Sequence, residues 1–234
     1  TIGPCKRPTL HTIGVLGCMA ERLKLAVFER KPFINVVCGP DSYRSLPQLL
    51  ASAESGTKAV DVDLSMHETY DEELIESVRN PLSKSAFVSI MRGCNNMCTF
   101  CIVPFTRGRE RSRPVDNVEQ EIETLSQQGV KEITLLGQNV NSYNHLSEVK
   151  ADPITYSVGF TPLFKPKHGM RFTELLDRLS HKFPSVRFRF TSPHPRDFPD
   201  GLLELIKERS NIAKHIHLPL QSGSTSVLER MRRG

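Results

Sequence analysis

Short apolar runs alternate with amphipathic helical stretches along most of this 234-residue chain, and this alternation restricts its fold more than any other feature. Parallel strands need a crossover connection, which is usually a helix, so the alternation favours a parallel sheet. The pattern predicts strands near residues 12–18, 33–37, 86–91, 132–136, 186–191 and 215–218, and helices near 19–30, 43–52, 117–128, 172–183, 201–208 and from 224 onward. The expected fold class is α/β.

Two such series follow one another, and a polar, acidic stretch at 57–84 is interpreted as a linker or an extended connection between them. Residues 1–80 are predicted to be the end of a small parallel α/β domain. Residues 85–234 hold four strand–helix units, which is consistent with part of a βα barrel. Within them, the polar stretch at 145–169 is predicted to be a surface insertion. A partial barrel leaves an open edge, and the chain starts with Thr1, so we expect the protein to continue beyond both ends.

The composition excludes two broad classes. Hydrophobic residues make up 38% and charged residues 24%, as in ordinary globular domains, and no apolar run is long enough to span a bilayer. Six cysteines in a chain of this size do not suggest a disulfide framework, since the chain is long enough to bury its own core. The net charge of +5 is compatible with a polyanionic partner without demonstrating one.

The segment RGCNNMCTFC places Cys94, Cys98 and Cys101 within eight positions, with the spacing C-x3-C-x2-C. Cysteine thiolates are the usual ligands of iron–sulfur clusters. A four-iron cluster with three such ligands keeps one iron for a ligand from outside the protein. Structural zinc is the alternative, although it usually takes two paired knuckles and no second pair is present. The spacing alone leaves both readings open.

The flanking residues carry a closer resemblance. The stretch SIMRGCNNMCTFCIVPFTRGRERSRP resembles the radical S-adenosylmethionine (SAM) signature of the methylthiotransferase family, and LLGQNVNSY, FTSPHP and HLPLQSGS are similar to its later strand ends, in the same order. Arg92-Gly93 and GQNVNSY resemble the tRNA-modifying, MiaB-type branch. The segment at 145–169 resembles the insertion of animal members that are described as cyclin-dependent-kinase-regulator-associated proteins.

The resemblance implies a radical SAM barrel with two four-iron clusters and SAM as cofactors. Cys94, Cys98 and Cys101 would hold the radical cluster. Cys18, in LGCMAER, matches the third of three ligands of an auxiliary cluster, whose first two ligands would lie upstream of this chain. Cys5 and Cys38 match no family ligand and are interpreted as buried or incidental residues.

Other residues take their expected roles from the same resemblance. The residues expected near the cofactor are Phe100, Gly137, Gln138, Asn139 and Gln221. The simpler alternatives are an ordinary tight turn at 137–139 and a glutamine that orders its own loop. No catalytic side chain is assigned beyond the cluster ligands.

Four arginines alternate in TRGRERSRP: Arg107, Arg109, Arg111 and Arg113. In an extended segment they would point to one side, as a strip that contacts phosphates. The alternative is a solvated or ion-paired loop, because Glu110 interrupts the series. Arg107 and Arg109 are the predicted tRNA-binding residues.

The implied reaction adds a methylthio group to C2 of N6-isopentenyladenosine at position 37, next to the anticodon of tRNA. The implied partners are tRNA, an electron donor, a sulfur source and a kinase-regulator protein, without a membrane. The implied location is mitochondrial, with a cytoplasmic pool as an additional option. Two rivals remain: a non-catalytic role in binding the kinase regulator, and methylthiolation of threonylcarbamoyladenosine tRNA or of a ribosomal protein.

Overall fold

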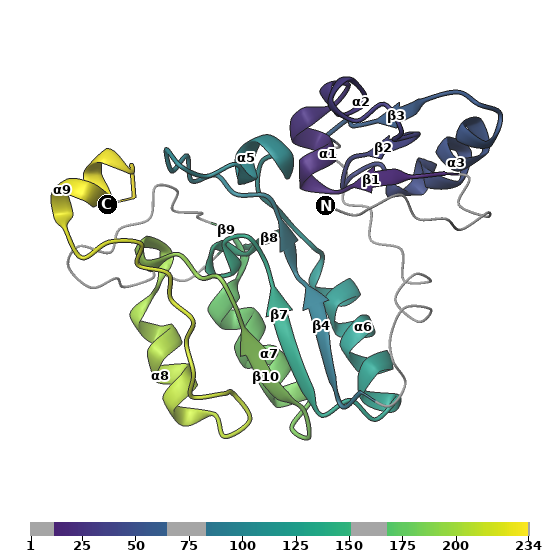
Figure 1. The fold of residues 1–234 in the computed structure, drawn as a ribbon. Helices are drawn as coiled ribbons and strands as arrows, with labels where there is room; N and C mark the ends of the chain where they lie inside the picture. The colour runs from purple at the N-terminus through teal and green to yellow at the C-terminus, as the bar shows by residue number, and fades with distance from the viewer. Residues whose placement is uncertain (1–11, 65–82, 151–167, 234) are drawn as a thin grey trace. The chain divides into compact units, whose positions relative to one another are not determined.

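The computed structural model describes residues 12–64, 83–150 and 168–233 (Figure 1). The chain divides into two compact units, Thr1–Thr69 with Phe105–Gly108, and Tyr70–Pro104 with Arg109–Gly234. Each unit has its own hydrophobic core. In the part of the chain that is described, no helix has the length and apolarity needed to cross a membrane.

The first unit is built on a parallel sheet of three short strands in the order β1-β2-β3: β1 (Gly14–Leu16), β2 (Val36–Cys38) and β3 (Ala59–Asp61). Its helices are α1 (Cys18–Leu23), α2 (Ala26–Arg30) and α3 (Leu46–Glu54), preceded by the 3-10 turn η1 (Tyr43–Ser45). β2 lies in the middle and is buried along its whole length. The core forms where Ala20, Val27, Ile34 and Val37 meet beneath the helices.

Two expectations for the first unit are wrong. The helix expected at 19–30 is broken, because Lys24 ends α1 with φ 49, outside the helical range. The linker expected from residue 57 begins with strand β3, whose Ala59 N–H donates to Asn35 O at 2.9 Å and so extends the sheet. The predicted linker had no apolar periodicity because β3 is an edge strand of only three residues. The remainder of that linker, 65–82, lies outside the described residues.

The second unit holds a parallel sheet of β4 (Ser85–Ser89), β7 (Glu132–Leu136) and β10 (Arg187–Phe190), in the order β10-β7-β4. Helices α6 (Val115–Gln127), α7 (Phe172–Lys182) and α8 (Asp200–Glu208) run beside these strands (Figure 1). The remaining elements are β5 (Met91–Arg92), α5 (Val103–Thr106), β6 (Arg111–Ser112), η2 (Val140–Ser142), β8 (Asn144–Lys150), β9 (His168–Arg171), η3 (Pro195–Asp197) and α9 (Thr225–Arg230). Sequence-adjacent strands are neighbours in the sheet, as in a βα barrel.

Helix α7 shows how the sequence fixes these elements. Glu174 accepts the Arg171 backbone N–H at 2.7 Å, which satisfies a donor at the start of the helix. One face of α7 buries Leu175, Leu176 and Leu179 completely, and each such side chain contributes about 1.5–3 kcal/mol on burial. Its first residue, Phe172, packs edge-on against Phe190 of β10, with ring centroids 5.1 Å apart.

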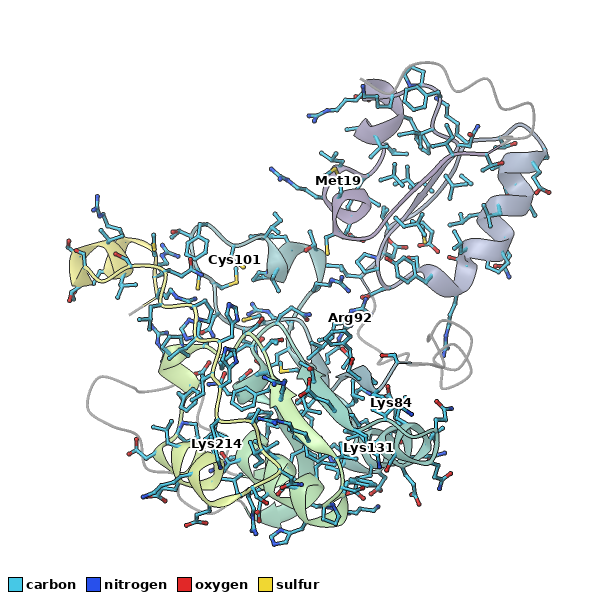
Figure 2. All side chains as sticks on the ribbon, turned by 60° about the horizontal axis from the view of Figure 1, so that its bottom comes forward. Met19, Lys84, Arg92, Cys101, Lys131 and Lys214 are labelled. Atoms are coloured by element: carbon cyan, nitrogen blue, oxygen red, sulfur yellow. The ribbon has the colours of Figure 1, made fainter. Side chains whose placement is uncertain are left out.

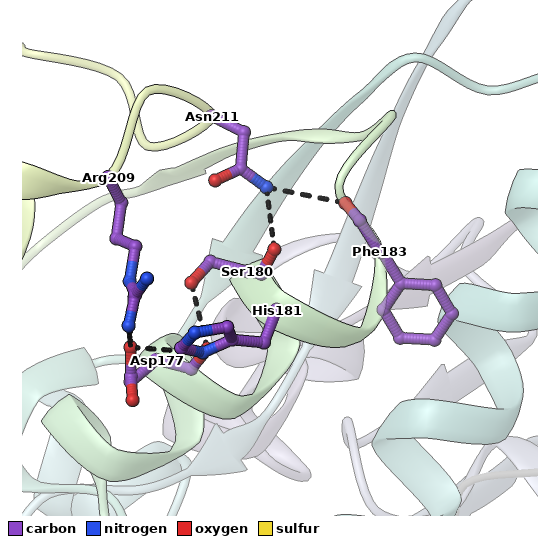
Figure 3. A network of polar contacts seen from close by, with 6 residues as sticks. All are labelled: Asp177, Ser180, His181, Phe183, Arg209 and Asn211. Atoms are coloured by element: carbon purple, nitrogen blue, oxygen red, sulfur yellow. Dashed lines mark hydrogen bonds and ion pairs between the residues drawn. The ribbon is translucent and has the colours of Figure 1, made fainter.

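The end of α7 is held by a network of polar contacts (Figure 3). The Asn211 amide donates to Ser180 O at 2.9 Å and to Phe183 O at 3.3 Å, which supplies partners for carbonyls that the helix leaves open. The Arg209 guanidinium pairs with Asp177 at 2.6 Å. These contacts fasten the segment after α8 to α7.

The strand expected at 215–218 does not form. Of the four strands predicted for the second unit, the sheet described here contains three: β4, β7 and β10. Pairing with β10 stops after a single bridge between Phe188 and Ile212. The Lys214 ammonium then donates to carbonyls at the end of α8, at 3.0 Å to Lys207 O and 2.8 Å to Arg209 O, which draws the chain away from the sheet edge. Ile216 and Leu218 still pack against the core, and this burial explains their strand-like apolar pattern.

The surface insertion expected at 145–169 begins and ends in strands that the sequence analysis did not predict. There β8 and β9 pair antiparallel, with Asn144 opposite Arg171 and His145 opposite Met170. A hairpin was hidden in the sequence because the two strands lie far apart along the chain and are polar. Residues 151–167 lie outside the described part.

Candidate functional site

Three chain segments meet at the carboxyl ends of the parallel strands of the second unit. They are the cysteine loop (residues 93–101), the turn at 137–139 after β7, and the β10 loop (residues 191–197). Figure 2 shows Cys101 at this end of the strands, whereas Lys84 and Lys131, which precede β4 and β7, lie at the other end. The C-terminal edge is where enzymes with parallel βα architecture place their sites.

The three thiols of the cysteine loop are free, and two of them are buried: Cys94 is 7% exposed and Cys98 is 8% exposed. The Asn96 backbone N–H donates to Cys94 Sγ at 3.4 Å, and Arg233 Nη1 lies 3.8 Å from Cys98 Sγ. Burial raises the pKa of Cys94 to about 12, although the Asn96 N–H opposes the rise. At neutral pH such a thiol is protonated, and a metal centre that binds the thiolate displaces the proton.

The cysteine loop is fastened by hydrogen bonds from several directions. The Gly93 N–H donates to Gln138 Oε1 at 2.6 Å, with Gly93 at φ 78, a conformation that favours glycine. Thr99 donates through its backbone to Met231 O at 3.0 Å and through its hydroxyl to Arg230 O at 3.3 Å. The Asn95 side chain accepts the Glu110 N–H at 3.3 Å. The loop is therefore ordered before any ligand binds.

His194 anchors the β10 loop to the turn after β7. Its backbone N–H donates to Asn141 Oδ1 at 2.8 Å and its carbonyl accepts Asn141 Nδ2 at 2.9 Å. Burial, reinforced by Arg233 and Arg196, lowers the pKa of the imidazole to about 3. Nδ1 accepts the Arg196 N–H at 3.2 Å, so the proton of the neutral ring is assigned to Nε2. This Nε2 is buried and has no hydrogen-bond partner among the residues described.

Two carboxylates stand beside the cysteine loop. Asp197 Oδ2 accepts two amide donors, Asn139 Nδ2 at 2.7 Å and Asn96 Nδ2 at 3.2 Å. Glu110 accepts the Ser142 hydroxyl at 2.6 Å. Burial and the nearby Asp197 raise the pKa of Glu110 to about 7, while the Ser142 hydrogen bond limits the rise. A buried carboxyl group whose pKa is close to neutral pH is typical of functional sites.

The residues predicted to bind the cofactor lie in different settings. Gly137 leaves no room for a side chain, since a Cβ there would stand 2.6 Å from Met91 Cγ and 3.1 Å from Val140 Cα. Gln138 and Asn139 are committed to the cysteine and β10 loops by the bonds described above. Phe100 is 52% exposed, and Gln221 is exposed in a segment where the predicted strand is absent. The cofactor role of these five residues stays a prediction.

The alternating arginines do not form one strip. Arg113 is 1% exposed and pairs with Glu121 at 2.6 Å, while also donating to Ser89 O at 2.6 Å. Arg109 is exposed. Arg107 belongs to the first unit, where its Nε donates to Cys18 Sγ at 3.1 Å. The single-sided strip is therefore wrong for Arg113, and tRNA contact by Arg107 and Arg109 stays a prediction.

Within the first unit, Cys18 and Cys38 have different surroundings. Cys18 is the partly exposed first residue of α1. Cys38 is fully buried and its thiol donates to Ser42 O at 3.2 Å; burial and nearby Asp61 raise its pKa to about 11. Cys5 lies outside the described residues; of the two thiols described in this unit, Cys18 is the partly exposed one. An auxiliary cluster at Cys18 stays a prediction.

The family model named Radical SAM superfamily matches residues 88–234. The chain belongs to the radical SAM superfamily. It is 58% identical over 98% of its length to the mitochondrial tRNA methylthiotransferase CDK5RAP1 of Mus musculus, of which it covers 40%. It is 54% identical over 95% of its length to the protein of that name in Homo sapiens, again covering 40%.

More distant relatives carry a related name. The chain is 48% identical over 95% of its length to the tRNA-2-methylthio-N(6)-dimethylallyladenosine synthase of Chloroherpeton thalassium, of which it covers 44%. The chain thus spans well under half the length of these curated relatives. A solved radical SAM methyltransferase, TsrM of Kitasatospora setae, aligns with a TM-score of 0.43 at 16% identity, over 62% of this chain and 24% of that one.

The cysteine loop fits the iron–sulfur cluster that the radical SAM family implies. It offers three thiols on one short segment, and N–H donors already point at the sulfurs of Cys94 and Cys98. His194 Nε2 and Arg233 Nε, which are buried and have no hydrogen-bond partner in the part of the chain that the structure describes, are further donors for an anionic group. No three His, Cys, Asp or Glu side chains among the described residues are gathered as a single metal ion requires. A cluster takes its thiolates on different irons, so they stand further apart than around one ion.

Five residues with distinctive surroundings were not singled out from the sequence: Asn96, Glu110, His194, Asp197 and Arg233. His194 sits inside FTSPHP, and Asn96 lies between two of the cysteines, so both were within the recognised motifs. Asp197 takes its two amide donors, Asn139 and Asn96, from 58 and 101 residues earlier in the chain, and nothing in the local pattern indicates such contacts.

Proposed function

We propose that the protein is a radical SAM methylthiotransferase that adds a methylthio group to C2 of N6-isopentenyladenosine at position 37 of tRNA. The observation that carries this proposal is the ordered cysteine loop, with two buried thiols, at the C-terminal edge of a parallel sheet. The relatives supply the reaction class, since their names state tRNA methylthiolation. The mitochondrial names of the first relatives support a mitochondrial location.

The chain's own residues have clear tasks in this proposal. Cys94, Cys98 and Cys101 hold the cluster, and Gln138 and Asn96 fix the shape of the loop that carries them. When bound, the cluster and SAM together supply a radical that can attack an unactivated carbon. Neutral His194 presents an N–H donor to this site, and its low pKa keeps it uncharged at physiological pH. Burial of two of the thiols limits access of water.

The further elements of the proposal are a second four-iron cluster that includes Cys18, a sulfur source, an electron donor and tRNA as substrate. The auxiliary cluster would supply the sulfur, with two more cysteines from outside this chain. Contact with a kinase-regulator protein is a separate prediction, which no structural observation favours over catalysis.

The test is mass spectrometry of tRNA nucleosides from cells that lack the gene. We expect the 2-methylthio form of isopentenyladenosine to disappear and to return with the wild-type gene. A gene carrying Cys94→Ala, Cys98→Ala and Cys101→Ala should not restore it. Loss of a methylthio threonylcarbamoyladenosine instead would assign a different tRNA substrate, and restoration by the triple variant would favour the non-catalytic role.

A further inference from the structure

Asp197 connects three strand ends through a single oxygen atom. Its Oδ2 accepts the side-chain amide of Asn139, at the end of β7, at 2.7 Å. The same oxygen accepts the side-chain amide of Asn96, in the cysteine loop, at 3.2 Å. Both asparagines are buried, at 2% and 7% exposure, so bulk water has little access to replace these hydrogen bonds. One oxygen of the Asp197 carboxylate therefore satisfies two buried amide donors, and both would lose this partner if the carboxylate moved.

The backbone that carries Asp197 is itself firmly held. Asp197 closes the short turn η3, where its N–H donates to His194 O at 3.1 Å. The Asn141 side chain binds both the backbone N–H and the carbonyl of His194, as described above. Ser192, near the start of the same loop, has φ 60, a conformation that L residues seldom adopt and that surrounding contacts must maintain. Asp197 is therefore a fixed point to which the cysteine loop can be fastened.

Asn96 is the middle residue of the three between Cys94 and Cys98. Its backbone N–H is the group that donates to Cys94 Sγ at 3.4 Å. The side-chain amide of the same residue is held by Asp197, so the orientation of this peptide depends on that anchor. N–H donors to a ligand sulfur are among the factors that set the reduction potential of an iron–sulfur cluster.

We propose that Asp197 is a positioning residue of the cluster site: through the side chain of Asn96, it holds the backbone N–H that donates to Cys94 Sγ. The carboxylate suits this task better than a neutral amide, because charge-assisted hydrogen bonds are shorter and stronger and one carboxylate oxygen can accept two donors. Because Asn139 donates to the same oxygen, Asp197 also connects the turn after β7 with the β10 loop. This inference rests on the proposed cluster at Cys94, Cys98 and Cys101.

The test is a double-mutant cycle with Asn96→Ala and Asp197→Ala in the 234-residue chain, reconstituted anaerobically with iron and sulfide. Asn96→Ala keeps the backbone N–H and the formal charge and removes only the anchor. In the wild-type background we expect iron release to a chelator to be about tenfold faster, as for other residues that orient metal ligands. We also expect the midpoint potential of the cluster to fall, because the N–H to Cys94 sulfur is loosened.

The decisive comparison is the same Asn96→Ala change in the Asp197→Ala background, where it should alter neither quantity. Equal effects in both backgrounds, or no effect in the wild type, would overturn the inference. Asn117→Ala, an exposed asparagine on α6, is the matched control and should leave iron release and potential unchanged. Should Asp197→Ala fail to fold, Asp197→Asn replaces it, and the Asn96→Ala effect should shrink there. A wild-type chain that assembles no cluster would contradict the proposed function instead.

Discussion

The cysteine loop and the arginine segment (residues 107–113) are neighbours in sequence, and the interpretation of both started from the spacing of like residues. In the cysteine loop, the spaced residues lie in one loop, ordered by bonds from Gln138, Asp197 and the end of α9. In the arginine segment, the spaced residues separate, with Arg113 buried in an ion pair and Arg109 exposed.

The difference shows what spacing can and cannot predict. Three ligands within eight positions stay together whatever surrounds them, because the chain between them is short. Alternating residues share a face only while the backbone stays extended, and the segment here leaves helix α5 at Thr106 and enters strand β6 only at Arg111. Whether each arginine is buried or exposed then depends on its own surroundings.

The largest expected effect comes from the cysteine loop. Replacing Cys94, Cys98 and Cys101 together by Ala should abolish iron–sulfur absorbance and reductive cleavage of SAM, because no ligand for the cluster remains. Iron analysis, absorbance and product chromatography measure these losses. Cys38→Ala, which removes a buried thiol of the other unit, is the control and should retain both properties. Stoichiometric zinc without iron–sulfur absorbance in the wild type would contradict the assignment.

Arg113 gives the next largest effect, on stability. Arg113→Met removes the guanidinium that pairs with the buried Glu121 carboxylate, and breaking such a pair costs about 3–5 kcal/mol of unfolding free energy. Denaturant unfolding of the chain measures the loss. Arg109→Ala, an exposed arginine of the same segment, should change stability by no more than about 0.5 kcal/mol.

A second variant sharpens the test of this pair. Arg113→Met combined with Glu121→Leu removes both charges and should recover most of the loss, since an apolar pair of similar volume often replaces a buried ion pair. A loss for the double variant as large as for Arg113→Met alone would show that the arginine acts through its bond to Ser89 O or through packing, rather than through Glu121.

Much of the fold was predictable because it depends on local patterns. Strand β7 begins and ends at the predicted residues, and α7 and α8 agree within one residue, since each has a clear apolar pattern. The strand expected at 215–218 was wrong because apolar periodicity reports burial, and Ile216 and Leu218 are packed against the core without ladder partners.

The candidate site was predictable only where its chemistry is local. The three cysteines needed nothing beyond their spacing and flanking motifs. The asparagines, His194 and Asp197 act through contacts between different strand ends, and no single segment contains the information for them. Arg113 was predicted to lie on a solvent-facing strip because it alternates with three other arginines. That alternation does not indicate its ion pair with Glu121, eight residues further on.

A smaller effect is expected from Glu110, beside the cysteine loop. Its pKa of about 7 lies above the ordinary value of 4.5, so between these pH values the folded state binds the proton more strongly than the unfolded state. Stability contributed by the protonated group is therefore present below pH 4.5 and is lost as pH rises toward 7. His194, with its pKa of about 3, acts in the opposite direction, because stability is lost as pH falls below 6.5.

Glu110→Gln isolates the carboxyl contribution in the chain without metal. Relative to wild type, the variant should gain stability as pH rises from 4.5 to 7, measured by denaturant unfolding at several pH values. Ser142→Ala removes the hydrogen bond that limits the pKa of Glu110, so it should extend the upper end of this window to higher pH, while the lower end stays at 4.5. A constant difference between Glu110→Gln and wild type across the range would show that the carboxyl group is not perturbed by its site.

The smallest expected effect concerns the exposed part of the arginine segment and rests on the proposed tRNA substrate. Arg109 is exposed and has no ion pair among the described residues, so within the arginine segment it is the one best placed to contact a phosphate. Arg109→Ala in the full-length protein should weaken tRNA binding and reduce the slope of log affinity against log salt by about 1, since one phosphate contact no longer releases counterions. Arg187→Ala is the control, because this exposed arginine at the start of β10, 3.9 Å from Glu132, lies at the other end of the strands. Equal changes in slope for the two variants would mean that net charge alone, and not the position of Arg109 beside the cysteine loop, determines tRNA binding.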